Sequence, residues 1–88
     1  MVVDKKMKMT VISSKCKHYK EGDAMYSNGP MIDLEKSDAV CMTALSAVYP
    51  FVYAVRKGVT KETMGFSELV FQCPDCPDVV QFKIETLD

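Results

Sequence analysis

Two thiols, Cys73 and Cys76, lie three positions apart in the stretch Cys73-Pro74-Asp75-Cys76-Pro77. In a tight turn between two strands this spacing directs two sulfurs at one point, which resembles the metal-binding knuckles of zinc ribbons and rubredoxins. Thiol–disulfide chemistry is the alternative, but it needs a helix after the motif to lower the thiolate pKa. A period-two strand pattern follows Pro77 instead, so the spacing favours a metal.

A structural zinc site has four ligands, and this pair supplies two of them. The loop Cys16-Lys17-His18 offers a thiolate and an imidazole, and Cys41 offers a further thiolate near the start of a helix. Two ligand sets for zinc or iron are therefore open, and both contain Cys16, Cys73 and Cys76. The fourth ligand is His18 in one set and Cys41 in the other.

The same cysteines also allow two interpretations without a metal. Isolated cysteines often pack as small buried hydrophobic residues, and the chain would then be a structural or protein-interaction module with incidental thiols. Its partner would be another protein or a second copy of the chain. A thiol redox protein with Cys41 or Cys73 as nucleophile is the third alternative. Common enzyme motifs such as a Gly-rich phosphate loop or His-Glu-x-x-His do not occur, so a non-catalytic role is favoured.

Length and composition predict one domain over residues 1–88, because 88 residues with 48% apolar and 26% charged residues form a single small core. No apolar run approaches the roughly 18 residues that span a bilayer, and the first residues lack the apolar centre of a signal peptide. The sequence therefore predicts a cytoplasmic protein that does not associate with membranes. In a reducing cytoplasm its thiols stay free.

The net charge is −1, but the lysines are concentrated before position 21, where Asp4 alone opposes them. A basic arm of this kind can bind a polyanion. Because no arginine precedes Arg56, the pattern favours a solvated surface, and nucleic acid is not an expected partner.

The elements that position the cysteines are strands at both ends of the chain. Residues 6–12 and 80–84 alternate apolar and polar side chains, with Met7, Met9 and Val11 on the inward face of the first run. Asn28-Gly29 predicts a hairpin turn between residues 24–26 and 31–32. Residues 68–72 are expected to pair antiparallel with the last strand, which places Cys73 to Asp78 at a hairpin tip.

A helical pattern begins at Ser37, with Ser37 or Asp38 as N-cap. Its expected buried stripe consists of Ala39, Met42, Leu45 and Val48 and continues through Val52 and Val55. Pro50 predicts a second helical segment or a kinked continuation to residue 57, and Gly58 is the expected C-terminal cap. Residues 59–66 are expected to form a polar connection. Together these elements predict an α+β fold, a small antiparallel or mixed β-sheet with one kinked helix, or two consecutive helices, packed on one face.

The chain also resembles a family of short, uncharacterised bacterial and archaeal proteins. The matching residues are Cys16 followed by Gly22-Asp23, the helix Cys41-x-x-Ala44-Leu45-x-x-x-Tyr49-Pro50-Phe51-Val52-x-Ala54-Val55-Arg56-x-Gly58, and Cys73-Pro74-Asp75 before a last strand. The resemblance implies a single small α+β domain and brings no activity or cofactor. It further implies that Cys16, Cys41 and Cys73 are the shared thiols, whereas Cys76 is particular to this chain.

Overall fold

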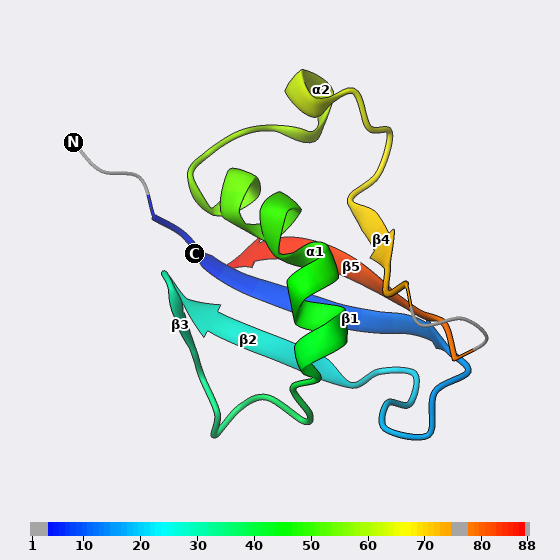
Figure 1. Ribbon diagram of the computed structural model, residues 1–88. Helices are drawn as coiled ribbons and strands as arrows, with labels where there is room; N and C mark the ends of the chain where they lie inside the picture. Colours follow the sequence, from blue (N-terminus) through cyan, green and yellow to red (C-terminus); the bar gives the residue numbers. More distant parts are fainter. Residues whose placement is uncertain (1–3, 75–77, 88) are drawn as a thin grey trace.

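A five-stranded antiparallel sheet with one long helix across one face forms this protein, in a computed structural model that describes residues 4–74 and 78–87 (Figure 1). The elements in chain order are β1 (Lys6–Ser14), β2 (Ala24–Asn28), β3 (Met31–Ile32), α1 (Met42–Arg56), α2 (Lys61–Met64), β4 (Val70–Gln72) and β5 (Val80–Leu87). The strand order β3-β2-β1-β5-β4 puts the first and last strands side by side at the centre of the sheet. The predicted α+β class is confirmed, and the sheet is antiparallel.

The two central strands carry the core, as their period-two pattern predicts. Met7, Met9 and Val11 of β1 are buried, and so are Val80, Phe82 and Ile84 of β5. Met9 pairs with Ile84 on one side and with Met25 of β2 on the other, so three strands contribute to one apolar surface. Burying a side chain of this size contributes about 1.5–3 kcal/mol relative to leaving it in water.

The helix begins at Met42, five residues later than predicted, because Ser37 and Asp38 have another role. The Ser37 hydroxyl accepts a hydrogen bond from the Tyr26 amide at 2.9 Å, and the Asp38 carboxylate accepts one from the Ala24 amide at 2.9 Å. These amides lie on the outer edge of β2, where β3 is too short to pair with them. The predicted helix caps are therefore wrong, because both side chains accept hydrogen bonds from backbone amides at the edge of β2 instead.

The buried stripe of α1 agrees with the predicted one at Val48, Val52 and Val55 and differs from it before Val48. Its members are Ala44, Val48, Val52 and Val55, spaced four, four and three residues apart. Met42, which was expected on the stripe, is 84% exposed. Ala44 is buried in the first turns of α1 in place of Met42, and the small alanine and valines allow close packing against the sheet.

The middle and the C-terminal end of α1 largely follow the prediction. α1 continues through Pro50, so one helix forms rather than two, although Pro50 has no amide to donate. Gly58 has a φ of 95° and ends the helix as predicted. Its amide donates to the Val55 carbonyl at 3.0 Å and the Val59 amide donates to the Ala54 carbonyl at 3.0 Å, which is the pattern of a Schellman motif.

The predicted hairpin between β2 and β3 is present, with its turn shifted by one residue. Asn28 pairs with Met31, so the central pair of the turn is Gly29-Pro30. Gly29 has a φ of 57°, and a Cβ at this position would lie 3.2 Å from Asp4 Oδ2. Glycine at position 29 therefore allows both the positive φ of the turn and the close approach of the Asp4 carboxylate.

Residues 59–66 form more than the expected connection, because they contain α2. Thr60 caps this short helix by accepting a hydrogen bond from the Thr63 amide at 3.2 Å. Phe66 then contacts a stacked pair, Phe51 of α1 and Phe71 of β4, whose ring centroids lie 4.0 Å apart. This aromatic cluster packs the segment between α2 and β4 against α1 and the sheet.

Among the described residues, no helix has the length and hydropathy needed to cross a membrane.

Candidate functional site

The three described cysteines border one buried cluster. Cys73 belongs to the cluster itself, and Cys16 and Cys41 are half-buried against it. Ser14 pairs with Val80, and the Cys73 amide donates to the Val80 carbonyl. The loop after β1 and the segment after β4 thus lie at the same end of the sheet (Figure 1).

Tyr19 is the centre of this arrangement. Its hydroxyl accepts a hydrogen bond from the Cys41 amide at 2.8 Å and donates to Met25 Sδ at 3.6 Å. Its ring meets Phe82 edge to face at a centroid distance of 5.3 Å. The Ser14 hydroxyl donates to the Tyr19 carbonyl at 2.9 Å, which closes the loop onto β1. Tyr19 therefore joins the loop, the sheet and the start of α1.

The sequence offered one signal for Tyr19, an aromatic residue in a charged loop, but it did not indicate burial. Burial raises the pKa of the Tyr19 phenol above 10.0, the hydrogen bond with the Cys41 backbone lowers it in part, and the nearby Cys41, Cys16 and Asp23 raise it further. The folded protein consequently holds this hydroxyl in its neutral form.

The predicted metal ligands differ in their burial and in their hydrogen bonds. Cys16 Sγ accepts a hydrogen bond from the His18 amide at 3.5 Å, while the His18 side chain is exposed. Cys73 is buried and its thiol donates to the Asp78 carbonyl at 3.7 Å. Within residues 4–74 and 78–87 no three His, Cys, Asp or Glu side chains form a group suited to a metal ion. Cys76 lies outside the described residues, so both four-ligand sets stay predictions.

A second polar site lies at the opposite end of α1, around Arg56. This arginine is buried, and its guanidinium stacks over the Tyr53 ring at 5.0 Å. Arg56 Nε lies 2.8 Å from Asp4 Oδ1, and Lys57 Nζ lies 3.5 Å from Asp4 Oδ2. The Nε–H does not point at the carboxylate, however, so the Arg56 contact is an ion pair by distance without a directed hydrogen bond.

Arg56 also lines a cavity of about 60 Å³ between α1 and the β2–β3 hairpin, named here the Arg56 cavity. Its apolar walls include Met9, Ile32 and Val52, and Ser27 and Tyr49 also line it. The sequence predicted Arg56 only as a favourable charge at a helix end. Its environment escaped prediction because Asp4 and Ser27 come from distant parts of the chain.

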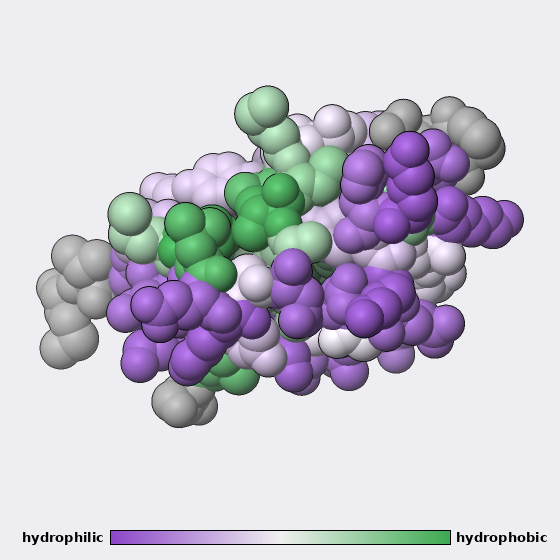
Figure 2. All heavy atoms as spheres, turned by 90° about the horizontal axis from the view of Figure 1, so that it is seen from below, coloured by the Kyte–Doolittle hydropathy of each residue, from purple (hydrophilic) through white to green (hydrophobic). Residues whose placement is uncertain are grey.

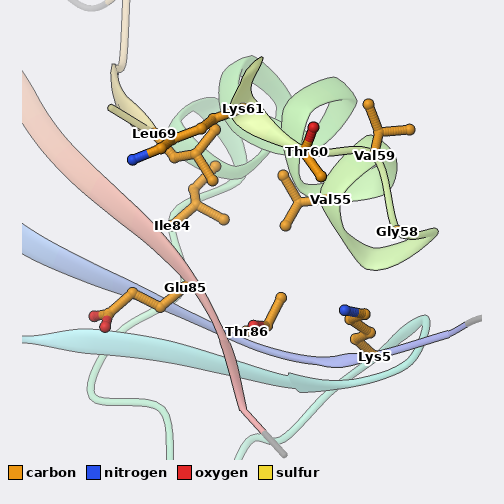
Figure 3. A pocket seen from close by; sticks show the side chains of 10 residues that line it. All are labelled: Lys5, Val55, Gly58, Val59, Thr60, Lys61, Leu69, Ile84, Glu85 and Thr86. Carbon is orange, nitrogen blue, oxygen red and sulfur yellow. The ribbon is translucent and has the colours of Figure 1, made fainter. Parts of the chain in front are cut away.

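A larger and more open hollow of about 240 Å³ lies between the α1–α2 turn and β5 (Figure 3). Lys5 extends toward it, whereas the ends of Lys61 and Glu85 point away. None of the buried side-chain atoms that lack a hydrogen-bond partner in the described part of the chain belongs to its lining.

No protein-family model, curated protein or solved structure matches this chain. The family resemblance carried by the cysteines and the Tyr49-Pro50 helix stays a prediction. Function consequently has to be inferred from the residues and their geometry.

Proposed function

We propose that this chain is a non-catalytic protein-interaction module that binds an apolar segment of a partner protein. The surface that carries the proposal is the β3–α1 patch, whose members are Met31, Leu34, Val40, Met42, Tyr49 and Tyr53. Three of them are the most exposed large apolar residues of the described chain, namely Met31 at 70%, Leu34 at 76% and Met42 at 84%.

The exposure of these side chains is the main support for the proposal. Figure 2 views the molecule from the side of β3 and the segment after it, and apolar residues gather there among polar ones. Exposed apolar residues that occur singly need no explanation, whereas a contiguous patch commonly marks an interaction surface. Methionine suits such a surface because its flexible side chain adapts to different partners.

The charges beside the patch indicate the chemistry of the partner. Arg56 and Lys57 share the single carboxylate of Asp4, which leaves a formal charge of +1 next to Tyr53. Opposite charge near the rim of an interface improves both orientation and association rate. The expected partner segment is therefore apolar and carries a carboxylate near one end.

A displayed library of random peptides of about 12 residues tests this proposal. Peptides selected on the wild type should contain apolar residues and an acidic group. Their affinity for a Leu34→Lys/Met42→Lys double variant should fall at least about tenfold, since two exposed contact residues then carry a charge. Affinity is measured by isothermal titration calorimetry.

Ile12→Lys is the matched control, because Ile12 is also an exposed apolar residue but lies at the irregularity in β1, outside the patch. It should bind the selected peptides as tightly as the wild type. Equal affinity of the double variant, or a library that yields no binders, would overturn the proposal.

A thiolate metal site is the second candidate, because the loop with Cys16 and the segment with Cys73 lie at one end of the sheet and the Cys41 amide bonds to Tyr19 of that loop. Elemental analysis of protein purified without a metal-affinity tag should then find about one zinc or iron per chain. Substitution of Cys73 by serine should remove most of it. A content below about 0.2 metal per chain, together with freely titratable thiols, would count against the site.

A further inference from the structure

The methionines of this chain divide into two groups by their exposure. Met7, Met9 and Met25 have 0% of their surfaces exposed, whereas Met31 is 70% and Met42 is 84% exposed. The three buried methionines belong to the core cluster, and the two exposed ones are neither in that cluster nor among the half-buried residues packed against it. A reagent in solution therefore reaches the thioethers of Met31 and Met42 first.

The thioether sulfur of methionine reacts with hydrogen peroxide. Its lone pair attacks one peroxide oxygen, and the O–O bond breaks as an S–O bond forms. The sulfur loses two electrons in this step, and the peroxide is reduced to water. A buried sulfur can react only after the core opens, and that of Met25 also accepts a hydrogen bond from the Tyr19 hydroxyl at 3.6 Å. Met64 is half-buried against the core cluster and lies between the two groups.

Oxidation at Met31 and Met42 would change the surface of the protein and leave its core intact. These residues are two of the three most exposed apolar side chains of the β3–α1 patch. A sulfoxide is polar, and covering its oxygen with an apolar partner removes water without supplying a hydrogen bond. The modified patch is consequently a poorer surface for an apolar segment.

We infer that Met31 and Met42 form an oxidation site of the β3–α1 patch, at which hydrogen peroxide lowers the affinity of the patch for apolar partners. The modification is reversible, since methionine sulfoxide reductases restore the thioether. The regulatory part of this inference rests on the proposed interaction, whereas the site of oxidation and the change in surface polarity do not depend on it.

Limited oxidation of the native protein with hydrogen peroxide tests the site. Dithiothreitol is added afterwards to reverse any disulfides, and peptide mass spectrometry follows the gain of oxygen with time. Met31 and Met42 should be oxidised at least about tenfold faster than the three buried methionines. In urea-unfolded protein all five should react at similar rates, which controls for the local sequence. Equal rates in the native protein would overturn the inference.

A Met31→Leu/Met42→Leu double variant is the matched control, because leucine keeps the patch apolar at similar volume and has no sulfur. Both positions are exposed, so the variant should fold. Oxidised wild type should elute earlier than untreated wild type from a hydrophobic-interaction column, whereas the same treatment should not change the elution of the variant. Unchanged elution of wild type with both methionines oxidised would also overturn the inference.

The peptides selected on the wild type test the regulatory part. Oxidation should weaken their binding at least about tenfold, and reductases for both sulfoxide stereoisomers should restore it. The double leucine variant should bind them equally before and after peroxide. Unchanged affinity of selectively oxidised wild type would overturn the regulation and leave the proposed interaction intact. A library without binders contradicts the proposed interaction alone, and the oxidation rates and column elution then decide whether the oxidation site exists.

Discussion

Replacing Phe82 with alanine should lower the free energy of unfolding by about 3–5 kcal/mol. Phe82 is fully buried in the central strand β5, where it pairs with Val11 of β1 and Phe71 of β4. Its ring also supports Tyr19 through the edge-to-face contact. Since small domains have a total stability of about 5–15 kcal/mol, the variant should lose a large share of it. Urea denaturation followed by circular dichroism at 25 °C measures the change.

Phe66→Ala is the matched control for this experiment. Phe66 belongs to the aromatic cluster over the crossover but is 37% exposed, so its removal leaves a smaller void and should cost less than half as much. A loss below about 1 kcal/mol for Phe82→Ala would contradict the position of Phe82 at the centre of the core.

Removing only the hydroxyl of Tyr19, in Tyr19→Phe, should cost about 1–3 kcal/mol near neutral pH. The ring contact with Phe82 stays, but the Cys41 amide loses its acceptor at the start of α1 and Met25 loses its donor. Cys41 is the N-cap residue of α1, and its side chain makes no capping hydrogen bond that could compensate. Chemical denaturation again measures the cost.

The same substitution has a predicted pH dependence. Because the pKa of Tyr19 is raised in the folded protein, the neutral phenol is favoured there, and ionisation is easier in the unfolded chain. This contribution to stability is fully present below about pH 10 and is lost as the pH rises through the pKa of the folded state. The stability difference between wild type and Tyr19→Phe should therefore be constant from pH 7 to 9 and should shrink above pH 10.

Tyr53→Phe serves as the comparison, since Tyr53 is 48% exposed and makes no hydrogen bond within the described residues that its loss would break. It should change stability little at pH 7. A difference between wild type and Tyr19→Phe that stays constant up to pH 11 would show that Tyr19 ionises equally easily in both states.

Local patterns were sufficient to predict the strands and their faces. Alternation in β1 and β5 depends only on side chains two residues apart, and both inward faces are buried as expected. Gly58 was predictable for the same reason, because the end of a helix depends on the conformation of one residue. The hairpin at Gly29 was predicted to within one residue.

Interactions between distant parts of the chain explain the errors. Ser37 and Asp38 have the side chains of helix caps, but in the folded protein they accept hydrogen bonds from the Tyr26 and Ala24 amides of β2, which β3 does not pair. The start of α1 was misplaced for this reason. Helix capping is a local preference that a tertiary hydrogen bond can replace.

For function, the sequence by itself determined which side chains have chemistry, the thiols and the single histidine, and which strands and turns carry them. Only the tertiary structure decided that Tyr19 is buried against the Cys41 amide and that Arg56 and Ser27 line one cavity. The physical reason is that residue type and spacing follow from the chain, whereas burial and the loss of hydrogen-bond partners depend on which distant segments pack together.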